Sequence, residues 1–438
     1  MHYPAELPIT PLARPPHATV SVPGSKSITN RALVLAALTA PGMTVRDALR
    51  SEDTEVMIDC LARLGWIVQP NWERNEISVQ RDQSHDIIDE DDWIPNGSAD
   101  LFVGNSGTTI RFLTAMLALG EGTYRLDGVP RMRERPIADL LDALRQLGVD
   151  ARSEAGNGCP PVVIHANGLR GGRVRVKADV SSQFLSGLLL VSPFGRGHTT
   201  IEIDGSLVSE PYVEMTLDML RWFGVMVDAS RPGAYFVRGR QQHGVVSYPV
   251  EPDASSASYF FAAAAITGGS VTVRGMRRDM LQGDVKFVDC LDQMGCEVEY
   301  GDDGITVVGR SLKGIDVDMN AISDTVMTLA AVACFADGPT TIRNVAHIRH
   351  KETDRIAAVA TELRKLGAEV DEFPDGLRIT PRPLTGCAVD TYNDHRMAMS
   401  LALVGLKVPG VVIRNPGCVA KTYPGFWDDF AQLGERGA

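Results

Sequence analysis

The sequence predicts an α/β protein of two domains, each built from three copies of a βαβαβ-type repeat. Three observations predict this fold class. The chain has 438 residues, which is too long for one ordinary domain. A helix tail of the form Leu-x-x-(Leu/Met/Phe)-Gly recurs six times, at intervals of roughly 65–85 residues. A strand, a turn of small polar residues and an apolar helix recur in phase with that tail.

The helix tails share an amphipathic pattern followed by a glycine, which we expect to be the left-handed C′ residue. They read LARLG, LRQLG, LRWFG, LDQMG, LRKLG and FAQLG, ending at Gly65, Gly148, Gly224, Gly295, Gly367 and Gly434. After each of the first five glycines comes a strand-like run: WIVQ, VDAR, VMVDA, CEVEY and AEVDE.

The second recurring element predicts six buried helices, because each helix body is almost entirely apolar. Each copy places Ser, Asn or Asp where a helix N-cap is favoured. The copies lie at residues 20–38, 101–117, 176–191, 250–266, 317–333 and 389–405.

The two chain ends predict how the six repeats divide. The sixth copy stops just after Gly434 without its closing strand, and the segment before Gly24 has no helix of its own. We expect that segment to supply the missing strand. Residues 1–23 and 252–438 would then form one domain and residues 24–251 the other. A two-strand hinge would join them, with the active site in the interdomain cleft.

Composition and charge exclude several classes of protein. The formal net charge of −12 argues against nucleic acid or an anionic membrane as a partner. Seven scattered cysteines without a CxxC pair fit reduced thiols better than disulfides or zinc. No leader and no apolar run of membrane-spanning length is visible, so we expect a cytoplasmic protein. Neither a phosphate-binding loop motif nor a dinucleotide motif is present, and we expect no metal and no cofactor.

One stretch, HIRHKETDR, indicates an anion-binding site. We expect Lys351, Glu352, Asp354 and Arg355 to lie within one helical turn, at the start of a helix that continues IAAVATELRKLG. Cations at a helix N-terminus oppose the helix dipole, which suggests an anion that binds between them and the helix end. The alternative is a solvated patch of ion pairs.

Basic and small polar residues recur at the other predicted helix starts. They include Lys26, Ser27, Arg31, Asn105, Gly107, Thr108, Arg111, Arg131, Arg133, Arg135, Ser181, Ser182, Gln183, Ser209, Tyr212, Asp324, His395, Arg396 and Lys421. If all six repeats direct these helix ends at one cleft, that cleft suits substrates with several phosphates and carboxylates.

Two carboxylates within this set have the properties of acid–base groups. Glu352 lies among cations, which would hold it ionised as a base or let it exchange protons with Lys351. Asp324 heads an apolar helix, and is either an N-cap or a desolvated general base that deprotonates a hydroxyl.

The motifs VPGSKSITNRAL, GNSGTTIRFL, PRMRERPI, VSSQFLSGLL, LVSEPY, DASSASYFFAAAAI, HKETDR, YNDHRMAM and AKTYP resemble those of the 5-enolpyruvylshikimate-3-phosphate synthases. The resemblance runs from about Pro23 to Asp429, with all motifs in family order. It implies a pair of inside-out α/β barrels of three repeats each, without metal or organic cofactor. It also implies a monomer that transfers the enolpyruvyl group of phosphoenolpyruvate to the 5-hydroxyl of shikimate 3-phosphate.

The resemblance implies a role for each matching residue. Asp324 is similar to the family's base, Glu352 to its acid/base at the methylene carbon, and Lys26 would lie between the substrates. The phosphoenolpyruvate-binding residues would be Lys26, Gly107, Arg131, Gln183, Arg355, Arg396 and Lys421. The shikimate-3-phosphate-binding residues would be Lys26, Ser27, Arg31, Ser181, Ser182, Gln183, Ser209, Tyr212, Asp324, His347 and Lys351.

The chain departs from the family pattern at a few positions. His347 replaces a common Asn, and NSGTTIRF replaces NAGTAMRP, which changes Ser106, Thr109 and Phe112. Gly107 is retained, and its missing Cβ is expected to leave room beside the phosphoenolpyruvate site. We therefore expect the family inhibitor glyphosate to compete with phosphoenolpyruvate.

Two other functions fit the same fold. A UDP-N-acetylglucosamine enolpyruvyl transferase usually carries a Cys near the PRMRERP loop, but this chain has none between Cys60 and Cys159. A non-catalytic anion-binding protein on the same barrels would be expected to lose Asp324 or Glu352, and both are present.

Overall fold

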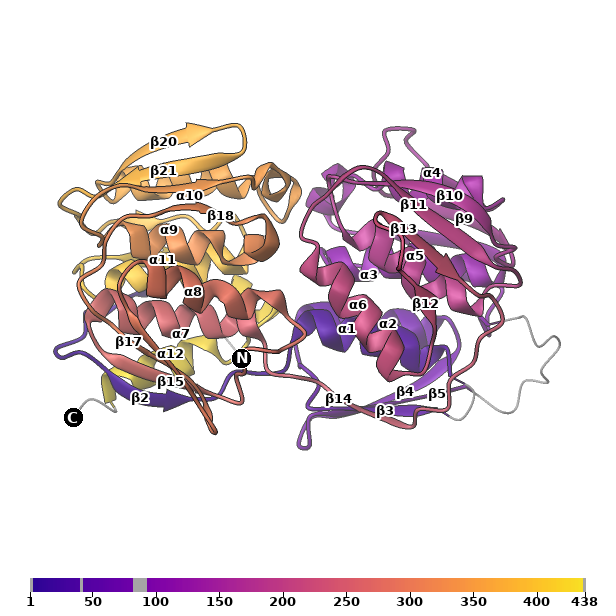
Figure 1. Cartoon of the computed structure of the whole chain (residues 1–438), viewed down its shortest axis with the longest axis horizontal. Helices are drawn as coiled ribbons and strands as arrows, with labels where there is room; N and C mark the ends of the chain where they lie inside the picture. The colour runs from indigo at the N-terminus through magenta and orange to yellow at the C-terminus, as the bar shows by residue number, and fades with distance from the viewer. Residues whose placement is uncertain (1–2, 40–41, 82–92, 436–438) are drawn as a thin grey trace. The chain divides into compact units, whose positions relative to one another are not determined.

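The computed structural model describes residues 3–39, 42–81 and 93–435. The chain splits into two compact units (Figure 1). Unit 1 comprises Met1–Pro23 and Glu251–Ala438, and unit 2 comprises Gly24–Val250. Residues 1–2 and 436–438, which begin and end the predicted terminal domain, lie outside the described residues.

Unit 2 contains six α-helices, three short 3-10 helices and twelve strands among its described residues. The helices are α1 (Lys26–Ala37), α2 (Glu52–Arg63), α3 (Gly107–Met116), η1 (Leu117–Leu119), η2 (Pro130–Glu134), α4 (Ala138–Gln146), α5 (Gln183–Val191), η3 (Ser192–Phe194) and α6 (Pro211–Trp222). The strands are β3 (Met43–Arg46), β4 (Trp66–Asn71), β5 (Glu76–Arg81), β6 (Ser98–Phe102), β7 (Glu121–Asp127), β8 (Asp150–Ser153), β9 (Val162–Asn167), β10 (Gly172–Ala178), β11 (Thr199–Leu207), β12 (Val227–Asp228), β13 (Ala234–Val237) and β14 (Ser247–Pro249).

Unit 1 repeats this organisation. Its helices are α7 (Ala254–Thr267), η4 (Gly283–Lys286), α8 (Phe287–Gln293), η5 (Asn320–Thr325), α9 (Val326–Ala333), η6 (Ala346–His350), α10 (Arg355–Lys365), α11 (His395–Gly405), η7 (Pro416–Lys421) and α12 (Phe426–Glu435). Its strands are β1 (Glu6–Pro8), β2 (His17–Val20), β15 (Ser270–Arg274), β16 (Glu297–Gly301), β17 (Gly304–Val308), β18 (Asp316–Asp318), β19 (Thr340–Arg343), β20 (Glu369–Phe373), β21 (Gly376–Thr380), β22 (Ala388–Val389) and β23 (Val412–Arg414).

The complete repeat is βαβαββ, so the predicted βαβαβ pattern lacked one strand. In the second repeat β6 pairs parallel with β7, and β8 and β9 form an antiparallel hairpin. The unpredicted strand β9 lies between β7 and β8 in the sheet. The sequence showed only one strand-like run after each of the first five helix tails, and the second strand of the hairpin has no comparable position in the repeat pattern.

The first strands of repeats one and four complete each other's sheets, although the predicted repeats grouped each strand with the helix that follows it. Strand β2 precedes α1 in the chain but pairs parallel with β15 of unit 1. Strand β14 precedes α7 but pairs parallel with β3 of unit 2. In each unit, the last strand before the chain leaves for the other unit completes a sheet of the unit that it leaves.

The N-terminal segment supplies the strand that the sixth repeat lacks, as predicted. Strand β1 pairs antiparallel with β23, with Glu6 opposite Arg414. The predicted α/β class is confirmed. The sheets of the described residues remain separate, and none closes into a barrel.

The apolar first helices form the middle of each unit. In unit 2, α1, α3 and α5 contact one another, and in unit 1, α7, α9 and α11 do so. Figure 1 shows the latter three between the β15–β17 sheet below and the β20–β21 hairpin above. The predicted N-caps are confirmed by side-chain hydrogen bonds at Ser25, Ser106, Asp253 and Asp394.

Hydroxyl and amide contacts show that the N-terminal halves of these helices lie side by side. In unit 2 the Asn30 amide donates to Thr108 Oγ1 over 2.7 Å. In unit 1 Thr328 Oγ1 lies 3.2 Å from Ser258 Oγ and 3.3 Å from Ser400 Oγ. Because the positive ends of the three helix dipoles gather there, each unit has one end suited to anions.

The glycine after each helix tail is left-handed in five of the six repeats. The φ angles are 99° at Gly65, 84° at Gly148, 75° at Gly224, 108° at Gly295 and 103° at Gly367. The prediction is wrong for Gly434, which lies inside α12. Among the described residues α12 continues through Gly434 to Glu435, so this glycine keeps a helical position.

We predict that Gly224→Ala lowers the free energy of unfolding by about 1 kcal/mol, because a Cβ disfavours left-handed backbone. An added Cβ would meet no atom within 4 Å, so the backbone alone is tested. Gly434→Ala, inside a helix, is the matched control and is expected to change the free energy of unfolding by no more than about 0.5 kcal/mol. Chemical denaturation measures both, and equal losses would contradict the prediction.

Candidate active site

The stretch HIRHKETDR forms a 3-10 turn, a short bend and only then a helix. Helix α10 begins at Arg355, and the side chain of its N-cap, Asp354, accepts from the Ala357 amide over 3.1 Å. Lys351 and Glu352 precede the helix, so the prediction that all four charged residues share one helical turn is wrong. The helix starts later than the charge pattern indicated because Asp354 is its N-cap.

Arg355 is the centre of the site in unit 1. Its guanidinium is 1% exposed and is bound by three carboxylates. Nε lies 2.8 Å from Asp394, Nη2 lies 2.8 Å from Glu352, and Nη1 lies 3.1 Å from Asp324. Burial by itself would lower the pKa of Arg355, but Asp394 and Glu352 outweigh it and raise that pKa.

Asp324 lies in the 3-10 helix η5 and is not an N-cap, since α9 is capped by Thr325. Besides Arg355, its carboxylate accepts from Arg396 over 2.8 Å and lies 3.6 Å from Lys351 Nζ. The sequence allowed Asp324 to be either an N-cap or a general base. The structure excludes the N-cap, and the role of a base stays a proposal. Three cations, Lys351, Arg355 and Arg396, thus lie within 3.6 Å of this carboxylate.

Glu352 lies among cations, as the sequence indicated. It is buried, and its carboxylate bridges Arg355 Nη2 at 2.8 Å and Lys421 Nζ at 3.9 Å. A connected set of charges thus runs from Lys421 to Lys351, and holds the six predicted charged site residues of unit 1.

Two buried imidazoles border this set. His347 Nε2 lies 2.9 Å from the hydroxyl of Ser323, the residue before Asp324. Burial, together with the Lys351 charge, lowers the pKa of His347 to about 3, so the ring is neutral at pH 7. Burial, together with Arg396, also lowers the pKa of His395 well below its usual value.

In unit 2, Lys26 forms an ion pair that the sequence analysis did not foresee. Lys26 Nζ lies 3.3 Å from Asp53, whose side chain is buried. Asp53 is in the first turn of α2, where acidic residues are common. The residues around Asp53 do not indicate that it pairs with Lys26, because Lys26 lies on another helix.

Gly107 begins α3 beside two guanidinium groups. A Cβ added there would lie 2.5 Å from Arg135 Nη2 and 3.0 Å from Arg111 Nη1. Arg135 in turn donates to the Asn105 carbonyl, and Arg111 donates to Gln183 Oε1 over 2.8 Å. The missing Cβ accommodates these arginines, so the expectation that it leaves open room is wrong.

Arg31 is buried and ties α1 to α5 and α6. It donates to the Tyr212 carbonyl, Thr216 Oγ1 and Ser186 Oγ over 2.8–3.3 Å. Its guanidinium also lies over the ring of Phe112, 5.0 Å from the centroid. Burial lowers the pKa of Arg31 to about 10, so it stays charged at pH 7.

The remaining predicted residues of unit 2 occupy helix starts. Ser182 is the N-cap of α5, and Ser181 Oγ accepts from the Gln183 amide over 3.3 Å. Ser209 has a left-handed φ of 50° and is buried, as is the Ser27 side chain. Arg131 pairs with Glu134 over 2.8 Å on its own 3-10 turn.

The sequence did not indicate that Asp394 and Asp53 are the buried partners of Arg355 and Lys26. Asp394 stands directly before His395 and Arg396, where the capping pattern predicted a helix N-cap. No sequence pattern indicated that Asp394 also binds Arg355, because 39 residues separate the two.

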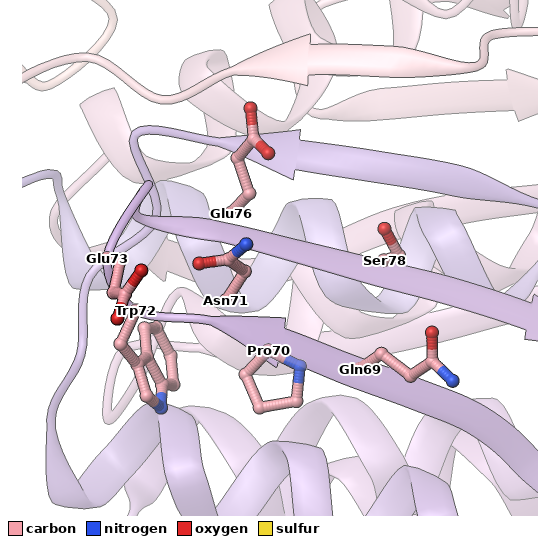
Figure 2. A pocket seen from close by; sticks show the side chains of 7 residues that line it. All are labelled: Gln69, Pro70, Asn71, Trp72, Glu73, Glu76 and Ser78. Carbon is pink, nitrogen blue, oxygen red and sulfur yellow. The ribbon is translucent and has the colours of Figure 1, made fainter.

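A separate hollow of 520 Å³ lies on the β4–β5 hairpin (Figure 2). It is lined by Gln69, Pro70, Asn71, Trp72, Glu73, Glu76 and Ser78. None of the predicted site residues lines it. The described residues contain no cluster of His, Cys, Asp and Glu able to hold a metal ion. Among those residues, too, no helix is long and apolar enough to cross a membrane.

Comparison with known proteins identifies the family. Residues 13–430 match the family model of EPSP synthase (3-phosphoshikimate 1-carboxyvinyltransferase). The chain belongs to the EPSP synthase family. The family match spans both units and includes every predicted site residue.

Relatives and a solved structure support this placement. The chain is 48% identical over 429 residues to the 3-phosphoshikimate 1-carboxyvinyltransferase of Nostoc punctiforme, covering 98% of this chain and 99% of the relative. It is 46% identical to that of a Marinomonas species, covering 94% and 95%. An Acinetobacter baumannii EPSP synthase structure matches with a TM-score of 0.80 at 25% identity, covering 98% of each chain.

We predict that His347→Asn reduces the acid sensitivity of folding. The folded-state pKa of His347, about 3, lies below its ordinary value of 6.5. The unfolded chain therefore binds a proton that the folded protein does not, and stability falls as the pH drops through 6.5. Between pH 7.5 and 5.0 this costs about 2 kcal/mol.

Chemical denaturation at both pH values tests this prediction. The loss of unfolding free energy should be smaller by about 2 kcal/mol in His347→Asn than in the wild type. His347→Gln should behave alike, because neither amide titrates. Equal losses of unfolding free energy in all three proteins would show that the pKa of His347 is the same in the folded and unfolded states.

Proposed function

We propose that the clusters of units 1 and 2 jointly bind phosphoenolpyruvate and shikimate 3-phosphate. The chain is an enolpyruvyl transferase of the shikimate pathway, forming 5-enolpyruvylshikimate 3-phosphate and phosphate. The observation that carries the residue assignment is the pair of carboxylates, Asp324 and Glu352, bound to one buried guanidinium. Addition followed by elimination needs one base and one acid at neighbouring positions.

The addition step uses both carboxylates. The 5-hydroxyl oxygen of shikimate 3-phosphate bonds to C2 of phosphoenolpyruvate while Asp324 accepts the hydroxyl proton. Glu352, in its acid form, gives a proton to the methylene carbon C3, which leaves a tetrahedral ketal phosphate. In the elimination step Glu352 takes a proton back from C3 and the C2–O bond to phosphate breaks. The proton held by Asp324 is released with the phosphate, which restores both carboxyl groups.

The cations of unit 1 are suited to the charges of phosphoenolpyruvate. Arg355, Arg396 and Lys421 are proposed to bind its carboxylate and phosphate, and Lys351 to bind shikimate 3-phosphate. Arg396 and Lys351 lie within 3.6 Å of Asp324. A substrate anion that draws their charge away would make Asp324 a stronger base, so substrate binding itself would activate the base.

The cluster of unit 2 is proposed to hold shikimate 3-phosphate and the other end of phosphoenolpyruvate. Lys26 would lie between the substrates. Ser27, Arg31, Ser181, Ser182, Gln183, Ser209 and Tyr212, with His347 of unit 1, are the further proposed contacts of shikimate 3-phosphate. Because Arg31 is buried and bound to protein groups, we propose that it acts through the Tyr212 backbone and the charge that it adds. Gly107, Arg131 and Gln183 are proposed for phosphoenolpyruvate.

We predict that phosphate release from phosphoenolpyruvate requires shikimate 3-phosphate and that Asp324→Asn lowers kcat by about 10²- to 10⁴-fold. The amide keeps the size of the side chain but cannot accept the proton. Glu352→Gln should cause a loss of similar size. Continuous measurement of phosphate in purified wild type and variants gives both values.

The control is Glu369→Gln, which removes an exposed carboxylate paired with Arg382 in the same unit and should leave kcat unchanged. Full activity of Asp324→Asn would contradict its assignment as the base. Release that depends on UDP-N-acetylglucosamine instead of shikimate 3-phosphate would contradict the substrate assignment.

We predict that glyphosate inhibits competitively with phosphoenolpyruvate. It carries a phosphonate and a carboxylate, which suit the same cations. The inhibition constant should lie near or below the KM for phosphoenolpyruvate in the phosphate-release assay. A constant far above that KM would contradict this part of the proposal, and Phe112 under Arg31 would be the first position to examine.

We also propose that the enzyme works in the cytoplasm as a monomer. The family resemblance supports both parts of this proposal, and the seven cysteines form no disulfide with one another. Light scattering should give a native mass near the chain mass of 47.4 kDa, and a doubled mass would contradict it.

A further inference from the structure

Glu362 is a buried carboxylate with no part in the proposed reaction. It lies in α10, and its side chain is 0% exposed. A buried carboxylate is costly unless it is paired and hydrogen-bonded. Lys365 Nζ lies 2.7 Å from it and also donates to Asp390 over 2.9 Å.

The other partners of Glu362 belong to the turn that precedes α11. The Asp390 backbone amide donates to Glu362 Oε2 over 3.0 Å, and the Tyr392 hydroxyl donates to Oε1 over 2.7 Å. Burial and the bond to Glu362 raise the pKa of Tyr392 to about 12, so the phenol keeps its proton at neutral pH.

The turn held in this way has an unfavourable backbone. Tyr392 and Asn393 are consecutive non-glycine residues with left-handed φ angles of 54° each. Such conformations cost about 1–3 kcal/mol apiece and persist only where surrounding contacts fix them. The next residue is Asp394, which binds Arg355, caps α11 and is followed two residues later by Arg396.

Helix α10 therefore holds residues 390–394 at two points. Arg355 and Glu362 are seven residues apart, which places them on one face of the helix, two turns from each other. Arg355 binds Asp394, and Glu362 binds Asp390 and Tyr392. The strained pair lies between these points. Without the Glu362 contacts, residues 390–393 would be held, among the described residues, only by Lys365 and by the bonds to Arg414 and Asn415.

We propose that Glu362 is a positioning residue for phosphoenolpyruvate binding, because it fixes the turn that orients Asp394 and Arg396. This inference rests on the proposed function, in which Arg355 and Arg396 bind phosphoenolpyruvate. Displacement of a binding group by about 1 Å can cost 10²-fold in rate, so a remote anchor has a measurable effect.

Three variants separate positioning from general stability. Glu362→Leu removes both acceptors while leaving Lys365 paired with Asp390. Glu362→Gln can accept from the Asp390 amide and donate to the Tyr392 oxygen, so it should restore the link. Leu363→Ala, at the next and equally buried position of α10, is the control for lost stability alone.

The readouts are kcat and KM for phosphoenolpyruvate, with the Kd for shikimate 3-phosphate from calorimetry. In Glu362→Leu we expect the KM for phosphoenolpyruvate to rise about 10- to 100-fold. The Kd for shikimate 3-phosphate should stay within about threefold, since most of its proposed contacts lie in unit 2. Glu362→Gln should remain within about threefold of the wild type, and Leu363→Ala should leave KM unchanged.

An unchanged KM in Glu362→Leu, or an equal rise in Leu363→Ala, would overturn the inference. If Glu362→Leu does not fold, Tyr392→Phe removes one of the two links at a half-exposed side chain and should still raise KM about threefold. Should the wild type release no phosphate, the proposed function fails. The Kd for phosphoenolpyruvate in the same variants then decides the inference.

Discussion

The burial of one guanidinium constrains the site in unit 1 more than any other interaction. Arg355 loses its hydration on folding, and an unpaired charge in that position would cost several kcal/mol. Three carboxylates from three separate segments compensate for this loss: Asp324 after β18, Glu352 before α10 and Asp394 before α11. Each segment is thereby fixed relative to the other two. The proposed base and the proposed acid thus owe their placement to the same cation.

The charge balance around Arg355 explains why an acidic protein can bind anionic substrates. The connected set contains four cations, Lys351, Arg355, Arg396 and Lys421, and three carboxylates, Asp324, Glu352 and Asp394. The ends of three helix dipoles add positive potential where α7, α9 and α11 begin. This excess of positive charge is confined to the site, so it is compatible with the net charge of −12 for the whole chain.

The strand exchange gives the repeats a second constraint. Since β2 pairs with β15, unit 1 is finished only after the chain has crossed into unit 2 and returned, whereas β14 completes unit 2 before the return. A cut at the first crossing would remove β1 and β2 from unit 1, and with them the pairing of Glu6 with Arg414. The same arrangement places both chain ends in unit 1.

The sequence by itself determined the features that depend on neighbouring residues. Turn and capping chemistry acts over a few residues. It accounts for the left-handed glycines after five helix tails, the strands after those five tails and the N-caps Ser25 and Asp253. The motif positions of Asp324, Glu352 and Arg396 were visible for the same reason.

The tertiary structure alone decided which groups meet. No spacing in the sequence indicates that Asp394 binds Arg355, that Asp53 binds Lys26, or that Arg135 fills the space beside Gly107. The middle position of β9 and the exchange of β2 and β14 were equally unreadable. Each depends on contacts between segments far apart in the chain, and such contacts are fixed by the packing of whole repeats rather than by any local pattern.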